Sequence, residues 1–355
     1  MLTTTRAPLT PTETHRAHLR ELLDCAPALC DTGWASALAA TPRSAYALTI
    51  ALPHGSVTAD GPEADAYWAT LAATGVLATT SPDGSTVTWA PALGFAALLV
   101  HLELRARQTA LVIGARGGWE AAVIAAHPTR PEVTVCEPTP AIGAEAATRL
   151  GAAFSSARVE IANARDRLPA GRWDHIVVTG TTGHVPDLWV QALCPGGRLL
   201  TSIGQALAVV DRNSEGPGAT GRFVSLPAAF GPWNHPDRAG GPLLTERGAK
   251  GFDLFAFLPN PTCVESAIDP VRGSDRHSDI ALGLSYGLHV AMGRPQLDRF
   301  ALTLDSGRTL VTLVDMGGTP LRTWDLTPSA RPNPPITRTA RPATAPRPPI
   351  ACEES

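Results

Sequence analysis

The sequence predicts an α/β protein in which a parallel sheet carries helices on both faces, with helices before it and a β-rich extension after it. Between residues 108 and 204, short apolar runs alternate with helical stretches, which is typical of parallel strands buried on both faces. The preceding residues show helical periodicity. The residues after 205 form short strand-like runs separated by glycine and proline turns.

Residues 1–107 are expected to form a helical region. Thr12 is a suitable N-cap, and Leu19, Leu22 and Leu23 then fall on one stripe, so the segment from Thr12 onward predicts an amphipathic helix. Further helices are expected over residues 33–42, 63–75 and 91–104, with a turn over residues 81–85.

Residues 108–204 are expected to form the core of the α/β sheet. Strands are predicted over residues 110–113, 133–136, 158–162, 175–180 and 197–204. Helices are predicted over residues 118–126, 140–151 and 186–193. Each helix would return the chain to the edge at which the next parallel strand begins.

Residues 205–327 are expected to form a β-rich extension, and residues 328–355 a disordered tail. The run 300–314 reads as a β-hairpin around Asp305-Ser306-Gly307. The last 28 residues hold eight prolines and four arginines and nothing that could make a core. A ligand for a proline-binding partner is the alternative reading of this tail.

Composition excludes several classes of function. The net charge is -3 and Lys250 is the only lysine among 29 basic residues, which argues against a non-specific nucleic-acid binder. The six cysteines form no C-x-x-C pair and have no zinc-ligand spacing, so we expect reduced thiols and no metal. No signal peptide or bilayer-spanning segment is evident, and a cytoplasmic protein without membrane partners is expected.

A candidate cofactor loop follows the first predicted core strand. It runs from Gly114 to Gly118 and leads into a helix, so its backbone N–H groups would face a ligand at the helix N-terminus. Glu137 ends the second strand, 23 positions after Gly114, where a carboxylate can accept hydrogen bonds from a ribose diol. The glycine spacing does not match the G-x-G-x-x-G pattern of nicotinamide cofactor sites. A plain strand–helix connection is the alternative.

Several stretches resemble the protein-L-isoaspartate O-methyltransferase family. LVIGARGGWEAAVIAAH (111–127) looks like the family's strand, glycine loop and alanine-rich helix. The segment 172–204 is similar to the family's Y-D-x-I-I-V-T stretch with its closing P-G-G-R-L, and 33–46 resembles its W-x-x-A entry. Residues 217–233 and 305–315 look like the carboxyl extension of longer actinobacterial members. The chain is therefore identified as a divergent member of the long form.

The resemblance implies a Rossmann-like methyltransferase fold, S-adenosyl-L-methionine as cofactor, and methylation of an Asp or isoAsp side chain of a protein or peptide. Residues 1–107 would then lie on the substrate side. Matching positions give the expected cofactor-binding residues: Gly114, Ala115, Arg116, Gly117, Gly118, Glu137, Asn163 and Asp166. The last two fall near the family's H-G-D segment, with Asp166 one place late.

The acceptor side is expected around the family's T-x-S-x-P motif, which falls on TVTWAP (86–91). Thr88 is then the candidate catalytic hydroxyl, and Trp89 stands at the serine position. Further candidates for binding the substrate lie at the end of the fourth core strand and in the loop after it: Thr179, Thr181, Thr182 and His184. For these residues, ordinary strand-end or loop roles are the alternative.

Three departures from the family pattern, Arg116, Val112 and Trp89, leave two functions open. Arg116 replaces the middle loop glycine, and Val112 replaces the acid that usually precedes the loop. Arg116 could pair with a substrate or cofactor carboxylate, or fill the space that the cofactor needs. Trp89 could stack on a peptide side chain or plug the acceptor pocket. The first function is an S-adenosylmethionine-dependent carboxyl O-methyltransferase.

The second function is a catalytically degenerate relative that binds a peptide or a partner protein. A nicotinamide oxidoreductase is a third and weaker reading. General repair of damaged proteins, tailoring of one dedicated peptide, and the oligomeric state are not distinguished by the sequence.

Overall fold

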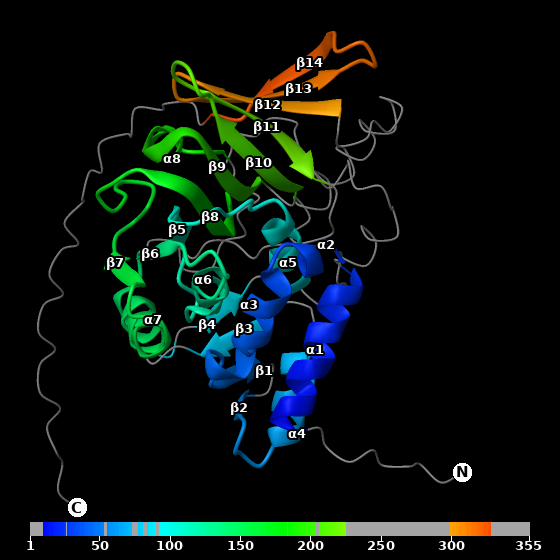
Figure 1. Ribbon diagram of the computed structural model, residues 1–355, viewed down its shortest axis with the longest axis vertical. Coiled ribbons are helices and arrows are strands. Elements are labelled where there is room, and N and C mark those ends of the chain that lie inside the picture. The colour runs from blue at the N-terminus through cyan, green and yellow to red at the C-terminus, as the bar shows by residue number, and fades with distance from the viewer. Residues whose placement is uncertain are drawn as a thin grey trace, which may run out of the picture.

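The structure, a computed structural model, describes residues 10–327 apart from 26, 53–54, 73–76, 81–83, 85, 90–91, 183, 204–205 and 225–298. It contains a ten-stranded sheet and a separate four-stranded sheet. Figure 1 shows the large sheet in the upper part of the molecule and the small sheet below it among the first helices. The predicted tail, residues 328–355, lies outside the described residues.

The expected parallel core is present. Five parallel strands lie side by side in the order β9-β8-β5-β6-β7. Their bounds are β5 Thr109–Ile113, β6 Glu132–Glu137, β7 Arg158–Ile161, β8 Trp173–Thr182 and β9 Leu193–Ile203. Each coincides with one of the predicted strands to within a few residues, and the α/β class is confirmed.

The apolar runs of these strands are buried on both faces of the sheet. Along β5, Val112 joins one core cluster, whereas Leu111 and Ile113 join the other. The first face is covered by α6 (Trp119–Ala125) and α7 (Pro140–Ala153), and the second by α8 (Asp187–Ala192). Continuous apolar strands are stable only in this two-sided setting, since each successive side chain points to the opposite face.

Five antiparallel strands extend the same sheet beyond β9. They are β10 Ala206–Arg212, β11 Ala219–Val224, β12 Phe300–Asp305, β13 Arg308–Val314 and β14 Pro320–Asp325. The predicted hairpin is confirmed: Asp305 pairs with Arg308 across Ser306 and Gly307, which both have positive φ. β11 and β12 are neighbours although residues 225–299 separate them in the sequence.

The first hundred residues contain the expected helices and a sheet that the sequence analysis missed. The helices are α1 Pro11–Cys25, α2 Ala28–Asp31, α3 Trp34–Ala40, the 3₁₀ turn η1 Arg43–Ala45, α4 Ala64–Ala72 and α5 Ala92–Val100. The sheet has the order β2-β1-β3-β4, with β1 Thr49–Leu52, β2 Gly55–Thr58, β3 Leu77–Thr80 and β4 Thr86–Trp89. Strands of four residues are too short to show a clear period. Dividing the chain at residues 107 and 204 stays a prediction.

No helix of the described part is long and apolar enough to cross a membrane. Within the same residues, no group of three or more His, Cys, Asp or Glu side chains could hold a metal ion.

A buried histidine lies at the edge of the sheet where β5 and β8 begin. His175 Nε2 lies 3.0 Å from Gln108 Oε1. The neighbouring Asp174 carboxylate accepts hydrogen bonds from the Thr109 N–H at 2.8 Å and from the Thr109 hydroxyl at 3.0 Å. Burial lowers the pKa of His175 to about 4, because an imidazolium would lose its hydration there.

Stability is expected to fall as the pH drops from 6.5 to 4. The unfolded chain protonates His175 near pH 6.5, whereas the folded chain resists protonation until about pH 4. This group alone should remove about 3 kcal/mol of unfolding free energy over that window. Urea titrations at several pH values measure the effect, with His175→Gln as the control. If the unfolding free energy of His175→Gln fell as steeply between pH 6.5 and 4 as that of wild type, the pH dependence could not be assigned to His175.

Candidate functional site

The candidate site lies at the carboxyl ends of the parallel strands. Gly114 follows β5 directly, Glu137 is the last residue of β6, and Thr179 lies in β8. Because β5 pairs with both β6 and β8, these three residues share one edge of the sheet. Open α/β sheets bind their ligands at this edge, where the strand order changes direction.

The loop from Gly114 to Gly118 has a backbone that mostly glycine can adopt. Gly114, Gly117 and Gly118 have φ of 95°, 92° and 95°. Arg116 also has a positive φ, 43°, which is uncommon for a residue with a β-carbon and signals local strain. The turn closes where the Gly118 N–H donates to the Ala115 carbonyl at 2.6 Å, and α6 starts at the next residue.

Glu137 is joined to this loop by a hydrogen bond. Its Oε2 accepts the Ala115 N–H at 2.7 Å, and its Oε1 accepts the Thr139 N–H at 3.0 Å. Burial raises the pKa of Glu137, against the lowering effect of these N–H donors and of Arg116. A carboxylate has about four acceptor positions. In Glu137 three of them are taken, by the two N–H groups and by the Thr139 hydroxyl, so one position remains for a hydroxyl of the ribose diol that an adenosyl cofactor presents.

Buried charges lie next to the loop, and the sequence analysis missed two of them. Arg116 is 5% exposed, Arg43 2% and Glu120 0%. Burial lowers the pKa of Arg116 and lowers that of Arg43 to about 10, while Glu120 raises both. Glu120 therefore acts as a shared counter-ion for two guanidinium groups. The sequence does carry one indication of Glu120: it is the lone acidic residue in the first turn of the otherwise apolar helix α6.

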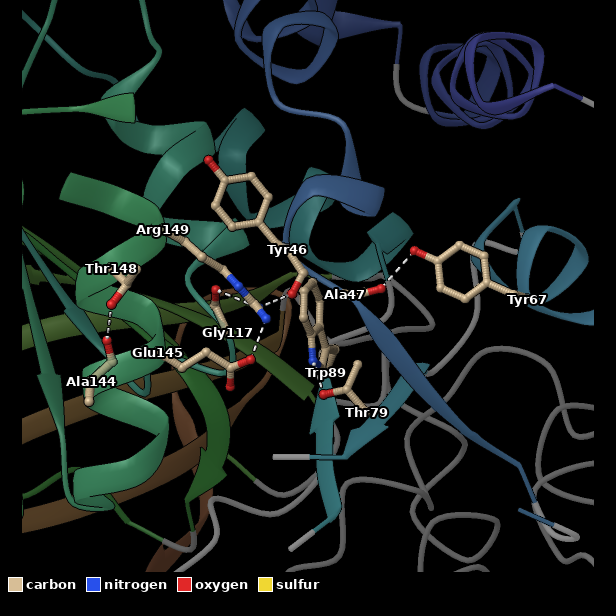
Figure 2. Close-up of polar contacts among 10 residues, drawn as sticks. All are labelled: Tyr46, Ala47, Tyr67, Thr79, Trp89, Gly117, Ala144, Glu145, Thr148 and Arg149. Carbon is tan, nitrogen blue, oxygen red and sulfur yellow. Dashed lines mark hydrogen bonds and ion pairs between the residues drawn. The ribbon is translucent and has the colours of Figure 1, made fainter. Parts of the chain in front are cut away.

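Trp89 packs directly on the loop. Its indole is fully buried, and its Nε1 donates to the Thr79 hydroxyl at 2.9 Å (Figure 2). A β-carbon added to Gly117 would lie 2.7 Å from Trp89 Cζ2, so the loop and the ring are in close contact. The Arg43 guanidinium lies 5.8 Å from the Trp89 ring centroid and 5.2 Å from that of Trp119, within the range of cation–π attraction.

Thr179 and Thr182, two of the predicted substrate residues, lie in the last part of β8 and donate hydrogen bonds to backbone carbonyls. The Thr179 hydroxyl donates to the carbonyls of Ile113, at 3.2 Å, and Gly114, at 3.1 Å. The Thr182 hydroxyl donates to the carbonyl of His184. These contacts support the strand ends, and a role in substrate binding stays a prediction. The side chains of Thr88 and Thr181 lie outside the described residues.

Asn163 and Asp166 form a turn at the end of β7. Asn163 Nδ2 donates to Asp166 Oδ2 at 2.8 Å, and Asn163 Oδ1 accepts the Arg165 N–H at 3.1 Å. The preceding Ala162 N–H donates to the Glu137 carbonyl at 3.0 Å, which places the turn beside the end of β6. The predicted cofactor residues thus come from three adjacent strand ends; their role toward a cofactor stays a prediction.

Comparisons with known proteins agree with this arrangement. The model of the family "Protein-L-isoaspartate(D-aspartate) O-methyltransferase (PCMT)" matches residues 79–224. Protein-L-isoaspartate O-methyltransferase 2 of Syntrophobacter fumaroxidans is 29% identical over 141 residues, which is 37% of this chain and 54% of that protein. Protein-L-isoaspartate O-methyltransferase 1 of Nitrosospira multiformis is 31% identical over 133 residues, 35% of this chain and 55% of that protein. The chain thus spans about half the length of these relatives.

A solved structure of a protein-L-isoaspartate O-methyltransferase shares the fold. It aligns with a TM-score of 0.52 at 16% identity, over 81% of this chain and 96% of that one. The matched residues 79–224 contain the glycine loop, Glu137 and all five parallel strands. The resemblance expected from the sequence is confirmed over residues 79–224, which match the model of the protein-L-isoaspartate(D-aspartate) O-methyltransferase family.

Proposed function

We propose that the protein is an S-adenosylmethionine-dependent carboxyl O-methyltransferase that modifies an Asp or isoAsp side chain of a protein or peptide. One observation carries the proposal: the family match includes the left-handed loop Gly114–Gly118 together with Glu137, whose carboxylate retains acceptor capacity. Loop glycines and a strand-end acid are the parts that an adenosyl group requires. A cytoplasmic location and residues 1–107 on the substrate side belong to the same proposal.

The chemistry asks little of the protein beyond positioning. The cofactor would supply an electrophilic methyl group bound to a sulfonium. A carboxylate acceptor is already ionised near neutral pH, so no strong base is needed. Glu137 and the loop amides would bind and orient the cofactor, Arg116 would supply a positive charge near the reacting groups, and the buried indole of Trp89 would exclude water.

Calorimetric titration with S-adenosylhomocysteine tests the proposal directly. Micromolar binding would support it, and the search would then turn to methyl acceptors carrying aspartyl or isoaspartyl residues. Absence of binding at millimolar ligand would count against it.

Replacing Glu137 with alanine should weaken S-adenosylhomocysteine binding by about 1–3 kcal/mol, because a charged hydrogen-bond acceptor is lost. Calorimetry measures the change. Glu132→Ala is the matched control, since Glu132 starts the same strand at its opposite end and is exposed. Equal affinity in Glu137→Ala and wild type would rule out the assigned role of this carboxylate.

A second function is favoured by a different observation. Arg116 and Trp89 are both buried against the loop, and the Glu137 carboxylate already binds the loop's Ala115 N–H. These contacts suit a catalytically degenerate protein that keeps the fold and binds a peptide or a partner. Under this function Arg116→Gly and wild type would both fail to bind S-adenosylhomocysteine, or only the variant would bind it.

A further inference from the structure

Arg149, on α7, reaches from its helix to the loop and to the first part of the chain. Its Nη1 donates to the Tyr46 carbonyl and lies 3.5 Å from the Gly117 carbonyl (Figure 2). Its Nη2 pairs with the carboxylate of Glu145, one helical turn earlier. One side chain thus contacts backbone groups from two segments that are distant in sequence.

The segment Thr41–Tyr46, called the brace below, also contacts the residue that directly follows the loop. The Trp119 Nε1 donates to the Thr41 carbonyl at 2.8 Å, and this hydrogen bond is buried. Trp119 is the first residue of α6, directly after the loop. The brace is therefore connected to the loop at Gly117 through Arg149 and to the start of α6 through Trp119.

The contact with the Gly117 carbonyl has a geometric consequence. The peptide unit between Gly117 and Gly118 is planar, so fixing its carbonyl also fixes the direction of the Gly118 N–H. That N–H donates to Ala115 and closes the loop turn. Gly117 has no side chain to limit its backbone, and its φ is 92°. The Gly118–Ala115 hydrogen bond and the Arg149 guanidinium therefore hold this peptide unit from its two sides.

The surroundings of the Arg149 guanidinium act on its charge in opposite directions. Burial lowers the pKa of Arg149, while Glu145, Tyr46 and Tyr67 oppose that effect. The side chain is 13% exposed, so the group is held in place rather than free in solvent. A planar guanidinium with several donors can serve two carbonyls and a carboxylate at once, which an ammonium group cannot do with the same geometry.

We propose that Arg149 is a positioning residue for the cofactor loop: through the Gly117 and Tyr46 carbonyls it holds the loop in the shape that accepts the cofactor. The inference rests on the proposed function, since it takes the loop to be the cofactor loop. Under this inference, cofactor binding depends on α7 and the brace, which hold the loop in shape, as well as on the loop glycines and Glu137.

The test compares wild type with Arg149→Met and Arg149→Lys in the full chain. Hydrogen exchange of the amides of residues 114–119 should become about tenfold faster in Arg149→Met, with little change in the strands. The dissociation constant for S-adenosylhomocysteine should rise roughly tenfold, with Arg149→Lys in between. The control is Arg172→Met, because Arg172 Nη1 also donates to two carbonyls, Gln191 and Leu193, but away from the loop.

Two outcomes would overturn the inference. One is unchanged exchange at residues 114–119 in Arg149→Met. The other is faster exchange spread evenly over the whole sheet, which a merely structural role would produce. If wild type itself does not bind S-adenosylhomocysteine, the proposed function fails, and loop exchange alone still decides whether Arg149 fixes the loop.

Discussion

Replacing Glu120 with glutamine is expected to lower the free energy of unfolding by about 3–5 kcal/mol. Glu120 is fully buried and is the counter-ion shared by Arg43 and Arg116, which are themselves 2% and 5% exposed. Without its carboxylate, the buried Arg43 loses its counter-charge, and the buried Arg116 keeps only that of Glu137. Urea unfolding followed by circular dichroism measures the change.

Two comparisons sharpen this prediction. Glu103→Gln removes an ion pair with Arg198 in which the Glu103 side chain is 70% exposed, and it should lower stability by less than about 1 kcal/mol. Adding Arg116→Met to Glu120→Gln should recover part of the loss, because one buried guanidinium charge is then removed as well. A loss from Glu120→Gln no larger than that from Glu103→Gln would show that the buried charges do not depend on each other.

Replacing Trp89 with alanine is expected to remove about 3–5 kcal/mol of unfolding free energy. The indole is fully buried, and its Nε1 donates a hydrogen bond to the Thr79 hydroxyl. Its ring lies within cation–π range of Arg43 and packs against Gly117. The surrounding backbone cannot collapse fully into the vacated space, so a cavity would remain beside the loop. Urea titration measures the loss, and Trp68→Ala, which removes a partly buried indole, should be milder.

A double-mutant cycle with Gly117→Ala isolates the contact between ring and loop. Alone, Gly117→Ala should be destabilising for two reasons: its φ of 92° and the 2.7 Å approach of its new β-carbon to Trp89 Cζ2. In the Trp89→Ala background the close approach to the ring is absent, so Gly117→Ala should lower the free energy of unfolding by less than it does in wild type. Strict additivity of the two losses would mean that the ring does not limit the loop.

The strands and the loop could be predicted because their signals are local. The run Ala110–Ile113 is apolar at every position, which only a strand buried on both faces requires, and glycines mark where it ends. Parallel pairing then brings Gly114 and Glu137 to one edge whatever the details of packing. The hydrogen bond from Ala115 to Glu137 was not foreseeable, because it depends on how the loop backbone turns.

The contacts that fill the site could not be predicted, since they join residues far apart in the sequence. Arg43 lies near Glu120 and the two indole rings only because the fold brings these distant segments together. The same is true of the contact between Arg149 and the Tyr46 carbonyl. The sequence marked Arg116 and Trp89 as departures from the family. It could not show that both side chains are buried against the same loop.

The pairing of β11 with β12 bears on how this protein can change in length. Residues 225–299 lie between two adjacent antiparallel strands, the first of which ends at Val224 and the second of which begins at Phe300. The entropy of closing such a connection grows slowly, by about 0.6 kcal/mol for each doubling of its length. The pairing of β11 with β12 is therefore compatible with connections of very different lengths, which makes this junction a suitable place for grafting a foreign domain.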